Sequence, residues 1–345
     1  MLLPILQQEL EQRLSEFRGD VGAVAAGAAV VDLTGVVALA TEGVTQIGSD
    51  TPVAETDAWH IGSCTKMFTA LTMATLIEDG RLDWGTTLAN VFTDVGSVDS
   101  SWRRVTIEDL LQCRAGIRAN IPISEMGAAH RCEDQLSDQR TTLAQSVLAA
   151  PSHNPGRFVY SNVGYILAGA AIDRLAEVPY ENALAQRVMS PAGITDFGFG
   201  APPRISGHRR AFQFGPIGVG GLIALDPDEP ANDNPALYTP AGRLHLPLEQ
   251  WAKVIGLFFG ENEEVVSLDS LRRIATSPSG GHFAMGWGAH PLGGLGMQGS
   301  NTLSCATVRL VGQYAALVVV SDARPKVLRG SATLADQMVA AAHER

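Results

Sequence analysis

The stretch that most constrains this chain is an apolar helix that carries a serine and a lysine one turn apart. Residues 60–80 read HIGSCTKMFTALTMATLIEDG, with apolar side chains on nearly every side and a glycine at the end, the pattern of a helix buried all round. Ser63 and Lys66 are spaced i and i+3, so their side chains share one face of the first turn. A lysine in an apolar site can lose its proton and activate a serine hydroxyl, which favours acyl transfer. The alternative is that this S-x-x-K sequence arises by chance and that Lys66 is an ordinary, solvated helix residue.

The four cysteines are dispersed along the chain. They are Cys64, Cys113, Cys132 and Cys305. No two of them have C-x-x-C spacing, so we expect neither a zinc site nor a disulfide framework, but free thiols in a reducing cytoplasm. Cys64 is an alternative nucleophile, although adjacent helix positions point in different directions, so its thiol is expected to face away from Lys66.

The charge of the chain favours a small molecule as its partner. The net charge of −11, from 25 basic and 36 acidic residues, is spread out with no long basic run, which disfavours nucleic acid and anionic membrane surfaces. The 345 residues, 46% of them hydrophobic, suffice for one large domain or two moderate ones. Residues 1–17 read as an amphipathic helix rather than a secretion signal, so a cytoplasmic protein is expected.

The hydrophobic pattern predicts strands at both ends of the chain and helices in the middle. The predicted strands cover 21–31 and 36–41, paired as a hairpin, and 283–289, 302–310 and 314–321. The predicted helices cover 141–150, 162–176, 180–189, 247–259 and 332–342, and another begins at Thr106 with a capping-box spacing to Asp109. Segments 81–104 and 200–234 are rich in turn-forming residues and are expected to be loops.

A tyrosine and an asparagine lie two positions apart in a turn that follows proline breakers and precedes a predicted helix. The phenol of Tyr160 has an ordinary pKa of about 10, too high for a base unless an ammonium such as that of Lys66 stabilises the phenolate. Asn162 offers one acceptor and two donors, enough to hold Lys66 and a substrate carbonyl together. The alternative is a buried tyrosine beside a helix-capping asparagine.

A glycine-rich segment, 294–302, precedes a late predicted strand. Its glycines let the backbone approach a ligand closely, so its amides can form an oxyanion hole. A plain glycine-rich turn is the alternative.

Together, S-x-x-K at 63–66, Y-x-N at 160–162 and the glycine turn before a late strand resemble the serine β-lactamase and penicillin-binding-protein superfamily. Within it, the chain is most similar to class C β-lactamases and their esterase and peptidase relatives. The similarity covers most of the chain, in the order and spacing of the family. It includes 61–70, 105–111, 155–165, 191–196 and 300–302.

The resemblance implies an α+β fold of the β-lactamase/transpeptidase type, in which an antiparallel sheet is flanked by helices and accompanied by an all-helical region. Residues 1–92 and 205–345 are expected to form the sheet region, and residues 93–204 the helical region. The active site is expected between the two. The strands predicted at both chain ends agree with this arrangement.

The resemblance also implies a role for each matched residue. Ser63 is expected to attack a carbonyl carbon, while Lys66 and Tyr160 share its proton as general base and acid. Asn162 is expected to orient the lysine and the substrate. The scheme uses no metal and no organic cofactor.

The glycine segment is expected to supply the oxyanion site. The resemblance places the amides of Ser63 and Ser300 around the oxyanion, with Gly299 shaping the approach. Where relatives carry K-T-G or H-x-G, this chain has Met297 followed by Gln298 and Gly299, so the cation that would contact a substrate carboxylate is missing. This departure favours neutral esters or amides, recognised through apolar contacts, over β-lactams.

A second departure lies in 110–116, LLQCRAG, where many relatives have a histidine and a serine. We interpret that turn as structural. Several other residues near the motifs are assigned to packing or to structural roles, although the aromatic ones among them can reach the groove. They are Phe283, Trp287, Tyr238, His60, His208 and His245.

The sequence therefore predicts a serine hydrolase that cleaves a small ester or amide through an acyl-enzyme on Ser63. One alternative is an acyltransferase of the same family, which passes the acyl group to an amine or alcohol. The other is a non-catalytic descendant that keeps the groove for binding or sensing, an alternative motivated by Met297.

Overall fold

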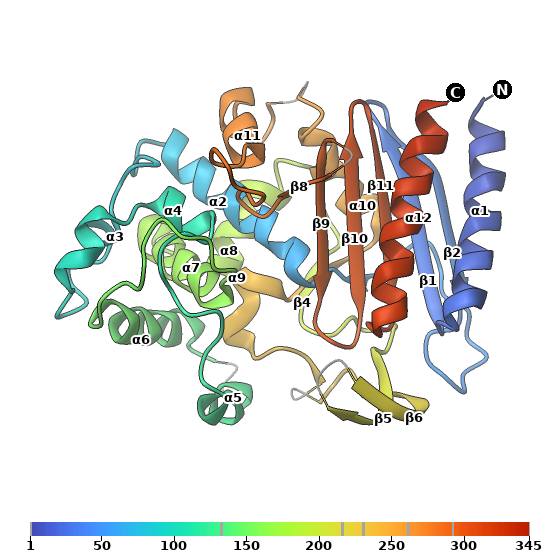
Figure 1. The fold of residues 1–345 in the computed structure, drawn as a ribbon, viewed down its shortest axis with the longest axis horizontal. Coiled ribbons are helices and arrows are strands. Elements are labelled where there is room, and N and C mark those ends of the chain that lie inside the picture. Colours follow the sequence, from blue (N-terminus) through green and yellow to red (C-terminus); the bar gives the residue numbers. More distant parts are fainter. Residues whose placement is uncertain are drawn as a thin grey trace.

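A six-stranded antiparallel sheet built from both ends of the chain is the frame of the protein (Figure 1). The structure is a computed structural model that describes residues 2–131, 134–214, 217–229, 232–260, 263–291 and 293–344. Its strands, in spatial order, are β2 (Gly35–Gly43), β1 (Ala25–Asp32), β11 (Tyr314–Val320), β10 (Cys305–Val311), β9 (Leu295–Ser300) and β8 (Gly288–Ala289). The pairing of β1 with β11 joins the two chain ends, as the sequence predicts.

Helices cover the sheet and fill the region beyond β9 (Figure 1). Two of them, α1 (Leu2–Val21) and α12 (Pro325–His343), lie on one face of the sheet, and α10 (Leu248–Leu257) lies on the other. The other α-helices of the described residues are α2 (Thr65–Glu78), α3 (Leu88–Val91), α4 (Ile107–Leu111), α5 (Ile123–His130), α6 (Leu136–Leu148), α7 (Asn162–Ala176), α8 (Tyr180–Leu184), α9 (Thr239–Gly242) and α11 (Leu268–Ala275). No described helix has the length and apolar run needed to cross a bilayer.

The central strands are buried on both faces because successive residues enter two different cores. Leu317 and Val319 of β11 belong to a core that also contains α2, α7 and α10. Val318, between them, belongs to a second core that is closed by α1 and α12. This two-sided burial explains why β11 is a continuous apolar run instead of an alternation of apolar and polar residues. The fold is therefore α+β, with an antiparallel sheet flanked by helices, as predicted.

Several local predictions are confirmed. The hairpin forms as β1 and β2, and the helix predicted over 162–176 forms over those residues as α7. At the start of α4, the Thr106 hydroxyl accepts from the Asp109 amide at 3.1 Å, and the Asp109 carboxylate accepts from the Thr106 amide at 3.0 Å. Cys64, Cys113 and Cys305 are free, and Cys132 lies outside the described residues.

Two segments that were predicted to be loops or turns contain strands. Within 200–234, β5 (His208–Phe214) and β6 (Ile217–Ala224) form a separate hairpin. Its glycines suggested a loop, but a Cβ on Gly218 would come within 2.6 Å of the Arg210 side chain across the hairpin, so close strand packing requires the glycine. Most of the predicted turn 294–302 is strand β9, which extends the sheet.

Three other predictions need correction at their bounds. Only Gly288 and Ala289 of the strand predicted over 283–289 form β8. The chain turns at Gly286, whose φ is +83°, and Phe283 makes an isolated bridge back to Gly288. The predicted loop 81–104 contains the short helix α3. The closing helix starts earlier than predicted, at Pro325, since proline is accepted at the first helical position.

A small sheet positions the segment that precedes α2. It consists of β3 (Trp59–His60), β7 (Leu244–Leu246) and β4 (Gly198–Phe199) in the order β3-β7-β4. One step further along, the Ile61 amide donates to the Leu244 carbonyl at 3.0 Å. This strand therefore carries the chain directly into the turn that bears Ser63.

A buried arginine joins α6, α7 and α8, and its removal should destabilise the helical region. The Arg140 guanidinium donates to Asp173 at 2.7 and 2.9 Å and to Glu181 at 2.9 and 3.0 Å, with none of the side chain exposed. In Arg140→Met, two carboxylates lose their counter-charge, so the free energy of unfolding should fall by about 3–5 kcal/mol in urea denaturation.

The matched control is Arg272→Met, whose guanidinium pairs with Asp269 at the surface of α11. It should leave the free energy of unfolding nearly unchanged. A loss below about 1 kcal/mol for Arg140→Met would contradict the structural role given to this cluster.

Candidate active site

Ser63 lies in a tight turn between β3 and α2. The turn is a single stretch of 3-10 helix, Gly62–Cys64, and the partly exposed Ser63 is its middle residue. Gly62 adopts a φ of +52°, and a Cβ there would come within 2.3 Å of the Ser300 amide nitrogen. Only glycine combines that backbone conformation with so close an approach, so the turn needs glycine immediately before the serine.

Lys66 is fully buried and its amine is surrounded by oxygen atoms. Its Nζ lies 3.2 Å from the Ser63 Oγ, 2.7 Å from the Asn162 Oδ1 and 2.6 Å from the Ala241 carbonyl oxygen. The side chain is 0% exposed, so the alternative of a solvated lysine is wrong. Burial lowers the pKa of Lys66 to about 7, from an ordinary value of 10.5. The amine can therefore be neutral near physiological pH.

The Y-x-N segment reaches the same amine from the helical region. The Ser161 hydroxyl caps α7 by accepting from the Gly164 amide at 2.8 Å, which places Asn162 on the first turn of that helix. Besides accepting from Lys66, Asn162 donates through Nδ2 to the Asn120 Oδ1 at 2.8 Å. Ser161, not the asparagine, is thus the helix cap, and the amide of Asn162 is left to face Lys66.

Tyr160 completes the cluster. Its ring centroid is 4.8 Å from the Lys66 Nζ. Burial raises the pKa of Tyr160 above its ordinary value, and the hydrogen bond to Ser63 opposes this only in part. The phenolate considered from the sequence is therefore disfavoured, and the group beside Ser63 is a protonated phenol that can donate or relay a proton.

The end of β9 lies main chain to main chain against the serine turn. A Cβ on Gly299 would come within 2.2 Å of the Ile61 carbonyl oxygen and 2.6 Å of the Ser63 amide nitrogen. Together with the approach of Gly62 to Ser300, this contact brings the amides of Ser63 and Ser300 to one place. The predicted oxyanion residues are thus adjacent in space.

Met297 and Gln298 point to opposite faces of β9. Met297 is 8% exposed and belongs to the core that contains α2. The Gln298 amide nitrogen donates to the Thr307 hydroxyl at 3.0 Å and to the Leu328 carbonyl at 2.8 Å, on the face covered by α12. Neither residue supplies a cation at the face of β9 that adjoins Ser63.

Two open pockets are lined by residues close in sequence to Tyr160 and to Ser300, and Ser63 lines neither of them. One, of about 510 Å³, is lined by Phe158 and Phe283, and Phe283 packs edge-on against the Tyr160 ring with centroids 5.6 Å apart. The other, of about 750 Å³, is lined by residues that include Asn301 and Thr302, which directly follow Ser300.

The remaining residues considered from the sequence lie in the core or in structural contacts. Trp287 and Tyr238 are buried, as expected. His208 accepts from the Ile47 amide at 3.1 Å and bonds the Ser321 carbonyl at 2.8 Å. His245 bonds the Gly200 carbonyl at 3.0 Å. The core positions expected for Trp287 and Tyr238 and the structural roles expected for the two histidines are confirmed.

Cys64 faces away from the lysine. Its buried Sγ lies 4.0 Å from the Ala306 carbonyl oxygen, and burial raises the pKa of the thiol well above its ordinary value. A thiol that stays protonated is a poor nucleophile. The geometry therefore disfavours the alternative in which Cys64 takes the place of Ser63. No group of three or more metal-ligating side chains occurs among the described residues.

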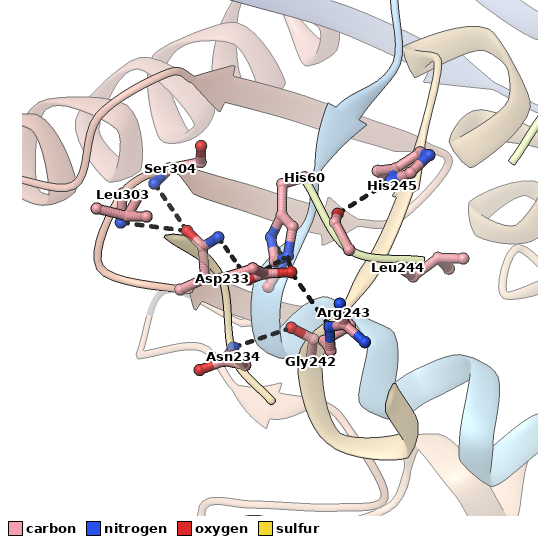
Figure 2. Close-up of polar contacts among 12 residues, drawn as sticks. His60, Asp233, Asn234, Gly242, Arg243, Leu244, His245, Leu303 and Ser304 are labelled. Atoms are coloured by element: carbon pink, nitrogen blue, oxygen red, sulfur yellow. Dashed lines mark hydrogen bonds and ion pairs between the residues drawn. The ribbon is translucent and has the colours of Figure 1, made fainter. Parts of the chain in front are cut away.

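His60 is the residue whose role the sequence missed. It was assigned to packing, but its ring bonds the Asp233 carboxylate at 3.2 Å and the Gly62 amide at 3.0 Å (Figure 2). Asp233 lies in a segment that was predicted to be a loop, 173 positions away. Nothing in the local sequence of either residue indicates the pairing, and only the fold brings them together.

Comparison with known proteins identifies related sequences and folds. The sequence profile of the Beta-lactamase family matches residues 8–340. Protein Rv1367c of Mycobacterium tuberculosis is 28% identical over 174 residues, which cover 46% of this chain and 43% of that protein. Unguisins hydrolase ungD of Aspergillus violaceofuscus is 26% identical over 159 residues, 44% of this chain and 28% of that protein. The matched stretches thus span less than half of either relative.

A solved structure shares the fold over the whole length. D-amino acid amidase from Ochrobactrum anthropi SV3, complexed with L-phenylalanine amide, has a TM-score of 0.77 at 17% identity, covering 98% of this chain and 99% of the amidase. This similarity concerns the arrangement of helices and strands.

The depressed pKa of Lys66 should be visible by NMR. In protein labelled with ¹³C at lysine Cε, one resonance, absent from Lys66→Met, should titrate near pH 7. Because the unfolded chain holds this proton up to about 10.5, it binds more protons than the folded state between those values, so the destabilisation caused by Lys66 should fall as the pH rises through that window. A Lys66 resonance that titrates only near its ordinary pKa would contradict the burial of the amine.

Proposed function

We propose that this chain, which belongs to the beta-lactamase family, cleaves a small ester or amide through an acyl-enzyme on Ser63. Hydrolase chemistry in general is supported by the family and by relatives named as a hydrolase and an amidase. The observation that carries the proposal is the 3.2 Å contact between the Lys66 Nζ and the Ser63 Oγ, made by an amine with a pKa of about 7. A neutral amine at that distance can remove the proton of the hydroxyl.

In the acylation step, the Ser63 Oγ bonds to the substrate carbonyl carbon while its proton passes to the Lys66 Nζ. The carbonyl oxygen takes the electron pair of the π bond, and the amides of Ser63 and Ser300 hold the resulting negative charge. When the tetrahedral intermediate collapses, the bond to the leaving group breaks, and the leaving group receives a proton relayed through Tyr160 from Lys66. Water then attacks the acyl-enzyme by the reverse proton route and releases the acid.

Asn162 has two tasks in this scheme. Its Oδ1 holds the lysine amine at 2.7 Å, and its Nδ2, now bonded to Asn120, can donate to the substrate instead. General acid-base help from Lys66 and Tyr160 is worth roughly 10² to 10⁴ in rate, and each oxyanion donor about 10² to 10³. Replacing Ser63 should therefore abolish nearly all of the activity, whereas disturbing the backbone at Gly299 should reduce it only in part.

The absence of a cation at Met297 supports a neutral substrate. A buried thioether cannot pair with a carboxylate, and burying an unpaired carboxylate is costly. The division of the chain into a sheet region, 1–92 with 205–345, and a helical region, 93–204, remains part of this proposal, with Ser63 contributed by the first and Tyr160 by the second.

Labelling and turnover test the nucleophile. Purified protein should hydrolyse short p-nitrophenyl esters, and a fluorophosphonate should modify Ser63, as read by mass spectrometry. Ser63→Ala should lose turnover by a factor of about 10⁴ or more, since it removes the hydroxyl that lies beside Lys66. Cys64→Ala, which changes a buried neighbour that faces away, is the matched control and should keep the label. Native protein that is never labelled at Ser63 would refute the proposal.

A pair of esters tests the effect of Met297. p-Nitrophenyl butyrate and the mono-p-nitrophenyl ester of succinic acid share a leaving group and similar acyl length, but only the second bears a carboxylate. The neutral ester should have the higher kcat/KM, by about tenfold or more, because Met297 supplies no cation to pair with the carboxylate. Equal values, or a preference for the charged ester, would show that another group recognises the anion.

A further inference from the structure

One buried carboxylate, Asp233, contacts three segments that meet at Ser63. Its side chain is 3% exposed. It accepts from the Asn301 Nδ2 at 2.8 Å, from the His60 Nε2 at 3.2 Å and from the Arg243 Nε at 3.3 Å (Figure 2). Burial alone would raise the pKa of Asp233, but its contacts with His60, Arg243 and Asn301 outweigh burial and hold the pKa below its usual value. The group is therefore a permanent anion at neutral pH.

The first contact chain runs through His60 to the serine turn. The Gly62 amide donates to the His60 Nδ1 at 3.0 Å. An amide N–H can only donate, so Nδ1 is the acceptor, and the proton of the neutral ring is on Nε2, where it is donated to Asp233. The carboxylate thus fixes the tautomer, and the tautomer fixes the Gly62 peptide, which precedes Ser63 and touches Ser300.

The second contact reaches the end of β9. Asn301 follows Ser300, and its Oδ1 accepts from the Leu303 and Ser304 amides at 3.2 and 2.9 Å. These bonds close the turn after the strand, while the Nδ2 of the same side chain holds Asp233. The anion therefore fixes the position of Ser300, the second predicted oxyanion donor.

The third contact reaches the segment under Lys66. Arg243 belongs to the stretch whose Ala241 carbonyl accepts from the Lys66 Nζ at 2.6 Å. Next to it, a Cβ on Gly242 would lie 3.6 Å from the Ser63 amide nitrogen. The ion pair with Asp233 holds this stretch against the serine turn.

We infer that Asp233 and His60 are positioning residues. They fix the relative positions of the Ser63 and Ser300 amides and of the Ala241 carbonyl that accepts from Lys66, and they do not touch the substrate. This inference rests on the proposed function at Ser63. It gives His60, assigned to packing from the sequence, an indirect role in the rate of the chemical step.

The test replaces the carboxylate with an amide of the same shape. All three partners of Asp233 are donors, and the amide of Asp233→Asn has only one acceptor oxygen, so its NH₂ must face a donor. If the imidazole then accepts at Nε2, its proton moves to Nδ1 and opposes the Gly62 amide. For p-nitrophenyl butyrate, kcat should fall about 10²-fold while KM changes by less than about threefold, as expected for the loss of one oxyanion donor.

The matched control is Asp57→Asn. Asp57 has the same 3% exposed side chain, accepts from the Ala54 amide at 2.8 Å and pairs with Arg204 at 3.1 Å, and neither of these partners contacts Asp233 in the bonds described above. It should lower stability without a selective loss of kcat. If Asp233→Asn does not fold, two His60 variants give the same test. His60→Leu removes the acceptor for the Gly62 amide, whereas His60→Asn restores an oxygen where Nδ1 was, and should recover at least about tenfold of the lost kcat.

Histidine ¹⁵N shifts give a readout that does not depend on activity. Wild type should show a neutral His60 ring protonated at Nε2, and Asp233→Asn should show Nδ1 protonated instead. Unchanged kcat and an unchanged tautomer in Asp233→Asn, or equal activity of His60→Leu and His60→Asn, would overturn the inference while leaving Ser63 catalysis intact. A wild-type protein that is never acylated on Ser63 would instead refute the proposed function, and the ¹⁵N shifts would still test the contact between Asp233 and His60.

Discussion

The burial of one amine determines how the rest of this molecule is arranged. Lys66 sits on a helix that is apolar on all sides, where an isolated ammonium would be very costly. The three oxygens around its Nζ come from Ser63, from the first turn of α7 and from the end of α9. The helical region and the late part of the chain must therefore meet at the start of α2, and this meeting point is the candidate active site.

A second constraint is the close approach of main chains around the serine turn. Gly62 and Gly299 let β9 contact the serine turn directly. Gly286, at a φ of +83°, lies close to the start of α2, where an added Cβ would come within 2.5 Å of the Met67 amide nitrogen. A side chain at Gly62 or Gly299 would push β9 away from Ser63, and one at Gly286 would collide with the main chain of α2. Because these glycines allow close contact, the position of β9 in the sheet determines where the Ser63 and Ser300 amides lie. Asp233 stabilises this arrangement by accepting from Asn301, His60 and Arg243.

The parts of the site that follow from local geometry could be predicted from the sequence. Helix periodicity alone puts Ser63 and Lys66 on one face, and continuous apolar runs identify β1 and β11. The hairpin β5 and β6 was missed because its glycines allow close strand packing and resemble loop composition. The contact of His60 with Asp233 was not predictable, since it joins residues 173 apart whose neighbours carry no periodic signal. The Tyr160 ring lies 4.8 Å from the Lys66 Nζ, but the burial that disfavours its phenolate involves packing against Phe283, which the sequence did not indicate.

The central claim is that Lys66, kept neutral by burial, takes the proton of Ser63. The most direct test is the rate of a single acylation event, measured by rapid mixing of excess enzyme with a p-nitrophenyl ester as a function of pH. With Lys66 as the base, the rate should rise through an apparent pKa of about 7 and then level off, and it should collapse in Lys66→Met. An acylation rate that is independent of pH between about 5.5 and 9 in an active wild-type enzyme would contradict it.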